Sequence, residues 1–422
     1  MITLNETVQQ FVLKGFNHQF GKPAVAVKDD PEWRKLRAVG TRLWLDTGDI
    51  DEATKLWSSS FDALTTNNTL LNKEIQKGIY DQLIPAAAAM LLAAEPGMSE
   101  QKLVLEIAFV LNAWHALRLV ERFDAFVSVE LHTDLANDVE ATVSYGKRYF
   151  AICPQRFIVK VPLTPAGFLG ARRLVLAGVP VNFTLGFSAR QNYLAALLTR
   201  PAYVNVFMGR LNAFVADNKL GSGQNVGEKA TLATQRQLLA LRKAGRTGSA
   251  LIGASIRSGA QVGGLAGCDV FTMPTKAAAD YRAHPLAQVT SHVADDPQVP
   301  LAAGVTFAQF NADTLWAVPR TFEDAVEALL RQDLDRLTPD AVQKHFADAG
   351  LGDLLPRWSP LQIETVTKDG KIPVYATWKP RLASGELGLD ALMNISALRS
   401  FAVDQTALDN RIRTVLKAGK GG

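Results

Sequence analysis

The chain has 422 residues, of which 48% are hydrophobic and 20% are charged, as is usual for a globular protein with a large core. The formal net charge is only +4 and no long run of Lys or Arg is present, which argues against a nucleic-acid partner. The six histidines are scattered, and Cys153 and Cys268 have neither metal-like spacing nor a CxxC motif. We therefore expect two buried thiols and no metal site.

Targeting and membrane segments are not evident in the sequence. Residues 1–16 are interrupted by polar side chains and lack the apolar core of a signal peptide. The run at 83–94 is the most membrane-like, but it contains a proline and is shorter than the roughly 18 residues that a spanning helix needs. We expect a cytoplasmic protein with no membrane partner.

Short apolar segments with a period of two residues alternate along the chain with stretches of helical periodicity. The segments predicted to be strands are residues 42–46, 61–67, 126–131, 156–162, 179–185, 202–209, 250–257 and 268–273. This alternation is typical of βα units around a parallel sheet. Eight such units favour a single (β/α)8 TIM barrel of the α/β class over an open sheet. No GxGxxG motif follows a strand and no P-loop motif occurs, so nucleotide-binding folds lack their main support.

Two predicted helices carry specific boundary signals. Asp49, followed three positions later by Glu52, predicts a capping box that opens a helix after the first strand. Pro165 stands in the first turn of a helix after the fourth strand, and Gly178 ends that helix just before the fifth.

The pattern changes after about residue 276. Residues 321–351 predict two helices, residues 389–416 predict a strong terminal helix, and the run KDGK at 368–371 predicts a hairpin-like turn. We divide the chain into an N-terminal helical leader, the barrel core, an insertion of unknown role and a C-terminal helix that packs on the barrel, at residues 1–40, 41–276, 277–390 and 391–422.

Residue parity along the strands predicts a site. In a TIM barrel alternate strand residues face the helices, and the others face the interior and the mouth at the carboxyl ends of the strands. If the hydrophobic parity faces the helices, as for Ile252, Ala254 and Ile256 in the seventh strand, the other parity faces inward. The inward set is Trp44, Asp46, Thr65, Asn67, Ser128, Glu130, Lys160, Asn182, Thr184, Asn205, Phe207, Ser255 and Arg257. Each polar residue alone is explained by a strand end that meets solvent, but agreement among seven strands indicates one converging site.

The predicted inward set suits imine chemistry. Lysine is rarely buried unless it is paired or put to use, and Lys160 lies in the middle of an otherwise apolar strand. A neutral lysine amine attacks a carbonyl, and the protonated imine then withdraws electrons so that a neighbouring carbon–carbon bond breaks or forms. Asp46 and Glu130 supply two carboxylates for proton transfer. The groups available to hold substrate hydroxyls or a water molecule are Asn67, Asn182 and Thr184.

A predicted anion site lies beside the later strands. Arg257, with Ser255, follows the seventh strand, and Arg210 comes just after the sixth. The planar fork of arginine suits a phosphate group, and phosphate sites in these barrels often lie near strands 7 and 8. The alternative for Arg210 is a salt bridge on the rim of the barrel.

The ordered motifs resemble those of the transaldolase family, within the class I Schiff-base aldolase superfamily. The chain carries, in sequence, DTGDI, DALTTNNTLL, VSVEL, IVKVPLTPAG, VNFTLGFSARQ, VFMGR, GASIR and AGCDVFTMP. The resemblance covers residues 41–276 and the terminal run LRSFAVDQTALDNRI. It implies an enzyme that transfers a dihydroxyacetone unit from sedoheptulose 7-phosphate or fructose 6-phosphate to glyceraldehyde 3-phosphate or erythrose 4-phosphate in the pentose phosphate pathway. It also implies no metal or organic cofactor, phosphorylated sugars as the partners, and a monomer or homodimer.

The resemblance assigns roles to residues of this chain. It implies that Lys160 forms the Schiff base, that Asp46 moves the proton of the aldol step, and that Glu130 with Thr184 holds the water of imine chemistry. The residues that it implies for contacts with the sugar are Asn67, Asn182, Ser188, Asn205 and Phe207, and those for the phosphate are Arg210, Ser255 and Arg257.

Some positions depart from the family pattern. Asn68 stands where many members have proline, and Asn205 stands where serine is common. Phe207 matches the transferase branch, whereas fructose-6-phosphate aldolases tend to carry tyrosine there. Residues 277–390 match nothing in the family pattern. The alternatives are a fructose-6-phosphate-aldolase-like enzyme, a Schiff-base enzyme acting on a sulfo-sugar, and a non-catalytic sugar-phosphate-binding barrel.

Overall fold

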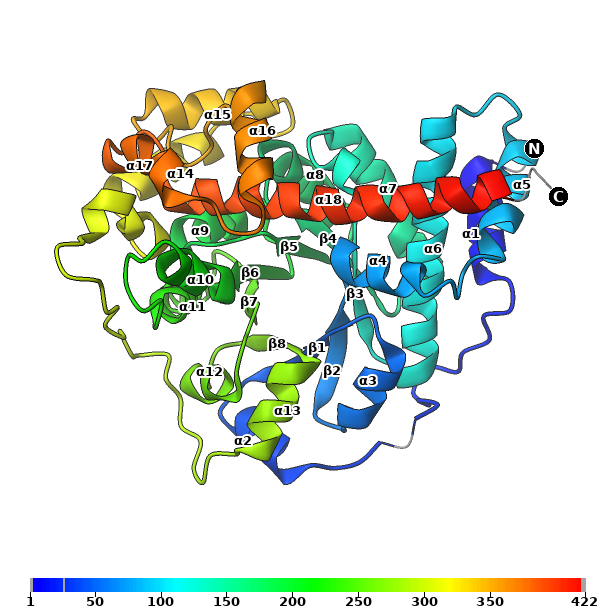
Figure 1. The fold of residues 1–422 in the computed structure, drawn as a ribbon, viewed down its shortest axis with the longest axis horizontal. Coiled ribbons are helices and arrows are strands. Elements are labelled where there is room, and N and C mark those ends of the chain that lie inside the picture. The colour runs from blue at the N-terminus through cyan, green and yellow to red at the C-terminus, as the bar shows by residue number, and fades with distance from the viewer. Residues whose placement is uncertain (1–2, 26, 419–422) are drawn as a thin grey trace.

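The computed structural model describes residues 3–25 and 27–418, and its centre is a closed barrel of eight parallel strands (Figure 1). The strands follow chain order around the barrel, and β8 pairs with β1 to close it. Their bounds are β1 Arg42–Asp46, β2 Phe61–Thr65, β3 Phe126–Glu130, β4 Phe157–Pro162, β5 Val181–Thr184, β6 Tyr203–Phe207, β7 Ala250–Ala254 and β8 Val270–Pro274. The predicted TIM barrel and its eight strands are therefore confirmed.

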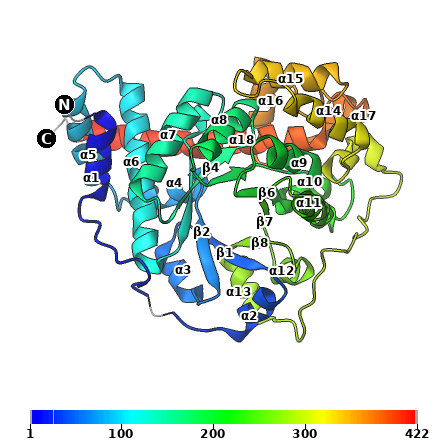
Figure 2. The same ribbon diagram turned by 180° about the vertical axis from the view of Figure 1, so that it is seen from behind.

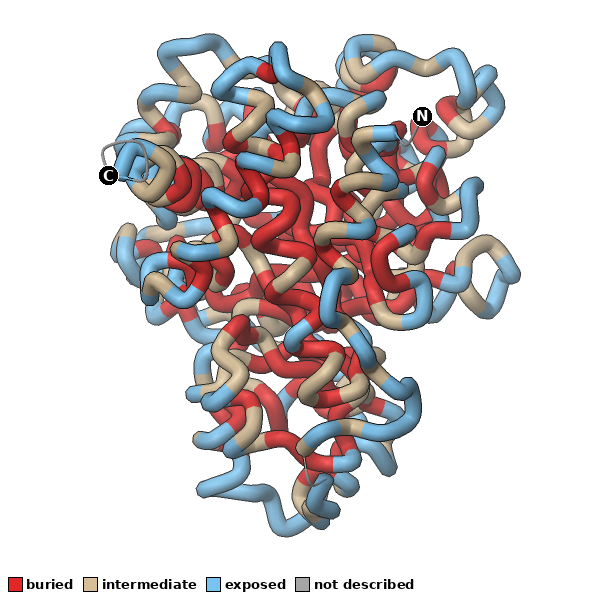
Figure 3. Tube along the Cα trace, turned by 90° about the vertical axis from the view of Figure 1, so that its right-hand side faces the viewer, coloured by how far each residue is buried: buried red, intermediate tan, exposed pale blue. Residues whose placement is uncertain are grey.

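Helices follow the strands and cover the outside of the barrel, as seen from behind in Figure 2. They are α3 Ile50–Leu56, α4 Asn68–Gln76, α5 Leu83–Ala94, α6 Glu100–Phe123, α7 Val139–Ile152, α8 Pro165–Leu176, α9 Ala189–Leu198, α10 Met208–Asp217, α11 Val226–Lys243, α12 Gly259–Gly264 and α13 Thr275–Ala283. The leader contributes α1 Leu4–Leu13 and α2 Pro31–Ala38. Apolar faces of strands and helices meet in one core, which Figure 3 shows as a buried centre surrounded by exposed loops.

Local signals placed the boundaries of the barrel helices. The Asp49 carboxylate accepts hydrogen bonds from the backbone N–H groups of Asp51 and Glu52, so it caps α3 as predicted. The capping box is only half formed, because the Glu52 carboxylate pairs with Lys55 instead. Gly178, with φ of 78°, follows α8 in the left-handed conformation that glycine adopts without strain.

Residues after α13 form a helical extension. Its helices are α14 Arg320–Leu330, α15 Pro339–Asp348, α16 Pro360–Asp369 and α17 Tyr375–Ala383, and short 3-10 turns lie at Phe307–Phe310 and Ala312–Leu315. The two predicted helices within 321–351 are confirmed. The predicted hairpin at 368–371 is wrong: the run KDGK ends α16, which a capping box between Ser359 and Gln362 begins. Gly370, with φ of 81°, ends that helix rather than turning a hairpin.

The terminal helix α18, Leu389–Ala418, confirms the prediction of a long closing helix. It runs across the molecule from the extension helices at one end to α1 and α5 at the other (Figure 1). It packs on α4, α6 and α16. The helix therefore joins the extension to the carboxyl-end side of the barrel.

Among the helices of residues 3–25 and 27–418, α6 is the one that is long and apolar enough to cross a membrane by length and composition alone, rather than residues 83–94. In the structure 78% of its most apolar stretch is buried inside the protein, and the core helix of a globular protein passes the same test. Cys153 and Cys268 are buried free thiols, as predicted.

Candidate active site

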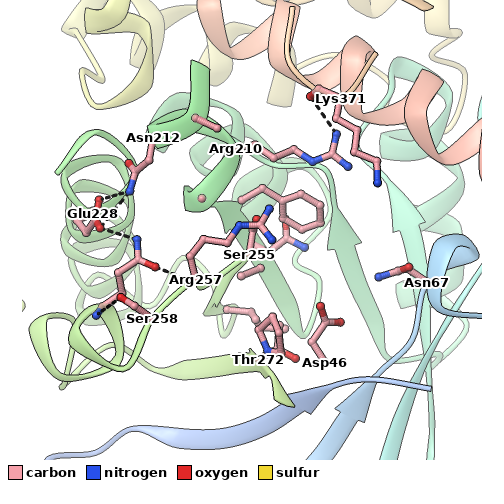
Figure 4. Close-up of a pocket in the computed structure, with 18 of the residues that line it drawn as sticks. Asp46, Asn67, Arg210, Asn212, Glu228, Ser255, Arg257, Ser258, Thr272 and Lys371 are labelled. Carbon is pink, nitrogen blue, oxygen red and sulfur yellow. Dashed lines mark hydrogen bonds between the residues drawn. The ribbon is translucent and has the colours of Figure 1, made fainter. Parts of the chain in front are cut away.

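A cavity of about 930 Å³ lies at the carboxyl ends of the barrel strands (Figure 4). This is the end at which active sites of TIM barrels lie. The predicted site residues that line the cavity are Asp46, Asn67, Lys160, Asn182, Asn205, Phe207, Arg210, Ser255 and Arg257. These residues come from six strands and the loops that follow them.

Lys160 is a buried side chain in a strand whose residues are all buried. Its Nζ lies 3.1 Å from Glu130 Oε2 and donates a hydrogen bond to the Thr66 carbonyl oxygen at 3.0 Å. The strand register aligns Glu130 on β3, Lys160 on β4 and Asn182 on β5, so the three side chains share one face of the sheet. A carboxylate and an amide therefore flank the lysine in the barrel interior.

Asp46 ends β1 and is partly exposed to the cavity. The Thr65 hydroxyl donates a hydrogen bond to Asp46 Oδ1 at 2.7 Å and lies 2.6 Å from the Thr272 hydroxyl. Burial raises the pKa of Asp46 above its ordinary value, and the charge of Lys160 opposes that rise. A carboxyl group with a raised pKa is suited to exchange protons near neutral pH.

Glu130 is buried beside Lys160, and burial raises its pKa while the charge of Lys160 opposes the rise. Although Glu130 Oε2 is close to the ammonium group, it has no hydrogen bond of good geometry within the described ranges. Asn182 Oδ1 and Thr184 Oγ1 are likewise buried without partners among the described residues. Buried polar atoms normally have partners, so these three atoms are suited to bind polar groups of a ligand.

Two arginines and a serine form a positively charged wall of the cavity. Burial and the neighbouring Arg257 lower the pKa of the Arg210 guanidinium to about 10. Arg210 donates to the Lys371 carbonyl oxygen at 3.4 Å and lies over the Phe401 ring. In residues 3–25 and 27–418 neither arginine pairs with a carboxylate, so the alternative of a rim salt bridge for Arg210 is wrong. Uncompensated cations of this kind suit an anionic ligand.

The loop that carries Arg257 is held by a polar network visible in Figure 4. Arg257 donates its backbone N–H to Gln261 Oε1 at 2.6 Å, and Gln261 donates its amide to Glu228 at 2.7 Å. Asn212 also donates to Glu228, at 3.0 Å. A Cβ at Gly209 would lie 2.2 Å from the Ser255 carbonyl oxygen, so the close approach of α10 to this loop requires glycine.

Comparison with known families identifies the family of the chain. A family model described as Transaldolase/Fructose-6-phosphate aldolase matches residues 43–332 of the 422-residue chain. The chain belongs to this family. The match extends beyond the barrel into α14 of the extension.

Individual relatives carry the transaldolase name. The chain is 30% identical over 235 residues to Transaldolase of Xanthomonas oryzae pv. oryzae (strain PXO99A), and the match covers 54% of this chain and 71% of that protein. It is 31% identical to Transaldolase of Xanthomonas campestris pv. campestris (strain B100), with the same coverage. Transaldolase 2 of Nostoc punctiforme is 27% identical over 214 residues, 47% of this chain and 51% of that protein. The barrel fold is consistent with the family, and the family and the names of these relatives indicate an enzyme of the aldolase and transferase type.

The departure from the transaldolase pattern at Asn68 has a structural explanation. Asn68 is buried and donates a hydrogen bond to Gln405 on α18 at 2.5 Å. Gln405 in turn donates to Asp409 at 2.9 Å. Asn68 does not line the cavity, and its hydrogen bond instead anchors the terminal helix.

Asn205, the other single-residue departure, lines the cavity, and so does Phe207. Asn205 accepts a hydrogen bond from the backbone N–H of Gly186 at 3.1 Å, so its amide oxygen supports the loop after β5. Phe207 contacts the rings of Phe187 and Phe401, with centroid separations of 5.8 and 6.4 Å. An apolar ring without a hydroxyl therefore lines this part of the cavity.

The parity rule fails for β7. Ile252 and Ala254 line the cavity instead of facing the helices. All residues of this strand are buried, so apolar side chains occupy both faces and alternation carries no information. Ser255 and Arg257 still reach the cavity because the backbone turns at Ser255, where φ is 61°.

The structure places three predicted site residues outside the main cavity. Glu130 and Thr184 are buried on β3 and β5 of the barrel. Ser188 caps α9 and donates a hydrogen bond to Asp390 Oδ2 at 2.7 Å, so its hydroxyl is committed to the terminal helix. A contact between Ser188 and a sugar stays a prediction.

Sequence reasoning also missed residues that line the cavity, among them Lys73, Asn212, Glu228, Gln261, Thr272, Lys371 and Phe401. The parity rule would have found Thr272 if it had been applied to the eighth strand, because Thr272 aligns with Trp44 of β1. No local pattern marks Lys371, which the extension brings to the site.

Proposed function

We propose that the protein is a transaldolase that acts through a Schiff base on Lys160. The donor is a ketose phosphate, sedoheptulose 7-phosphate or fructose 6-phosphate, and the acceptor is glyceraldehyde 3-phosphate or erythrose 4-phosphate, as in the pentose phosphate pathway. The observation that carries this proposal is the buried lysine 3.1 Å from a buried carboxylate, at a cavity that also holds a second carboxylate and two arginines.

In the first step the Lys160 amine attacks the C2 carbonyl of the ketose. Glu130 is the nearest carboxylate to the ammonium, so it accepts the proton that must leave before attack. The carbinolamine then loses water to give a protonated imine. Thr184 and Asn182 supply buried polar atoms for the departing water and for the sugar hydroxyls.

In the second step the Asp46 carboxylate takes the proton of the C4 hydroxyl, and the C3–C4 bond breaks. The bonding electrons pass to the iminium, which leaves an enamine of dihydroxyacetone and a free aldehyde. The acceptor aldehyde then binds, the enamine carbon attacks it, and Asp46 returns the proton to the new hydroxyl. Water adds to the resulting imine, and cleavage of its carbon–nitrogen bond releases the new ketose and the free Lys160 amine. The raised pKa of Asp46 suits a group that must give and take a proton in one cycle.

Phe207 favours transfer over simple cleavage. Its ring packs between Phe187 and Phe401 and offers no hydroxyl to deliver a proton or water to the enamine. A fructose-6-phosphate-aldolase-like activity is the second candidate, because the family includes both enzymes. Phe207→Tyr should shift product from transferred sugar toward free dihydroxyacetone.

Two further alternatives are an enzyme acting on a sulfo-sugar and a non-catalytic barrel. The preference of the anion site tests the first, and a turnover assay tests the second. Arg210 and Arg257 support a phosphate but also suit the sulfonate of a sulfo-sugar. A non-catalytic barrel would have no need for Lys160, Asp46 and Glu130 together. We propose that the enzyme works in the cytoplasm as a monomer or homodimer without a metal or organic cofactor.

The test is a turnover assay with fructose 6-phosphate and erythrose 4-phosphate, read by mass spectrometry of the sugars. We expect sedoheptulose 7-phosphate to form, and to be absent with Lys160→Met. Release of free dihydroxyacetone at the same rate with and without acceptor would contradict transfer and favour the aldolase. No product with phosphorylated donors, but turnover of a sulfo-sugar, would favour the sulfo-sugar enzyme.

A further inference from the structure

A loop of the extension reaches the mouth of the cavity. Lys371 and Ile372, which lie between α16 and α17, line the cavity although they are far in sequence from its other walls. The Lys371 side chain points into the cavity on the same side as Arg210 (Figure 4). The extension is therefore part of the site and not only a cover for the outside of the barrel.

Hydrogen bonds from two barrel-side elements fix this loop in place. Ser396 on α18 donates to the carbonyl oxygens of Gly370 and Lys371, at 3.0 and 3.3 Å. Asn218, at the end of α10, donates to the Pro373 carbonyl oxygen at 3.0 Å and accepts from the Tyr375 N–H at 2.8 Å. Lys371 is thus presented to the mouth by a backbone held at both ends.

The charge of Lys371 is uncompensated by protein. Across residues 3–25 and 27–418, no carboxylate forms a salt bridge with its ammonium. Glu228, an acidic residue of the cavity wall, is already bound by Asn212 and Gln261. Lys371 therefore adds a third cation to the wall that Arg210 and Arg257 form.

We propose that Lys371 is a specificity-determining residue that binds the phosphate of the sugar together with Arg210 and Arg257. Three cations favour binding of a phosphate dianion over a sulfonate monoanion, because each cation attracts a dianion more strongly. Loss of one cation should therefore weaken phosphate binding more than sulfonate binding. The sugar part of this inference rests on the proposed function, whereas the anion site does not.

The experiment compares Lys371→Met with Lys379→Met, a matched change at an exposed lysine of α17 that does not line the cavity. Both variants keep the backbone carbonyl at 371, which holds Arg210. Titration calorimetry with inorganic phosphate and with methanesulfonate measures the anion site without any turnover. We expect Lys371→Met to bind phosphate about tenfold more weakly than the wild type, a smaller loss for methanesulfonate, and no change for Lys379→Met.

Two outcomes overturn the inference. One is equal phosphate affinity in the wild type and Lys371→Met, including no measurable binding by either. The other is an equal loss of phosphate affinity in Lys379→Met, which would reflect the net charge of the protein and not a contact at the cavity. Borohydride labelling of the wild type with unphosphorylated dihydroxyacetone, which lacks the anion, tests Schiff-base formation separately from the anion site. If the wild type shows no such labelling while the phosphate difference holds, the proposed function fails and the anion site stands.

Discussion

The barrel and the extension build the same cavity by different means. In the barrel, Asp46, Glu130 and Lys160 lie on strands, and the register of adjacent strands sets their positions. In the extension, Lys371 is placed by side chains of α10 and α18 that hold its loop. Under the proposed function the strand ends hold the reacting groups, whereas the extension adds the Lys371 cation to the cavity wall.

A buried ionic cluster ties the two regions together. Arg190 on α9 makes two hydrogen bonds to Asp390 on α18, at 2.8 and 2.7 Å, and an ion pair with Asp353 of the extension at 2.8 Å. Ser188 donates to the same Asp390 carboxylate. The extension and the terminal helix are thereby fixed relative to the loop after β5.

The largest expected effect is the loss of a barrel carboxylate. Asp46→Asn should lower kcat by about 10²- to 10⁴-fold, because it removes the group that moves the aldol proton. Since burial raises the pKa of Asp46, its ionised form destabilises the fold. The melting temperature of the variant should therefore exceed that of the wild type at neutral pH, and the difference should shrink as the pH falls through the pKa of Asp46. Loss of kcat with a lower melting temperature at neutral pH would contradict this account.

The next effect tests the tie between the regions. Arg190→Met leaves the fully buried Asp390 without its cation, so we expect unfolding free energy to fall by about 3 to 5 kcal/mol. Arg320, whose side chain is 81% exposed in its ion pairs, is the control, and Arg320→Met should change stability little. Denaturant unfolding measures both. Similar losses of unfolding free energy in the two variants would contradict a stabilising role for the buried ionic cluster.

The direction of side chains in the barrel could be predicted from the sequence for some strands and not for others. The inward positions of Asp46 and Lys160 follow from a period of two residues, because the opposite faces of β1 and β4 differ in polarity along the sequence. In β7 both faces are apolar, so Ile252 was assigned to the wrong side. The alternation of polar and apolar residues predicts side-chain direction only where the two faces of one strand differ in polarity.

The extension was less predictable for a physical reason. Gly370 is compatible with both a hairpin turn and a helix end, and the capping box at Ser359 decides for the helix. Lys371 reaches the cavity through bonds from Ser396 and Asn218, which lie 25 and about 150 residues away in sequence. Such long-range contacts leave no local pattern.

A smaller effect is the pH dependence of stability that a buried histidine of the barrel region causes. Burial lowers the pKa of His115 on α6 to about 4. The unfolded chain takes up a proton at this residue near pH 6.5, whereas the folded protein stays neutral until about pH 4, so stability falls as pH falls through this window. His115→Gln should lack this pH-dependent part of the unfolding free energy, which amounts to up to about 3 kcal/mol between pH 6.5 and pH 4. Parallel stability curves for variant and wild type from pH 7 to 4 would contradict it.

The smallest effect sharpens the role of Asn68. Proline is tolerated at the first residue of a helix, and Asn68 begins α4. Asn68→Pro removes the bond to Gln405, so we expect a loss of about 1 kcal/mol in unfolding free energy and an unchanged Michaelis constant for the donor. A changed Michaelis constant with unchanged stability would place Asn68 in substrate binding instead.

The central claim is that Lys160 forms the Schiff base, and borohydride trapping tests it most directly. The protein is incubated with fructose 6-phosphate, reduced with borohydride and digested for peptide mass spectrometry, with Lys160→Met as the control and circular dichroism to check its fold. The account predicts a reduced sugar adduct on Lys160 alone, and no adduct on a folded Lys160→Met. An adduct on another lysine, or none with any ketose, would contradict it.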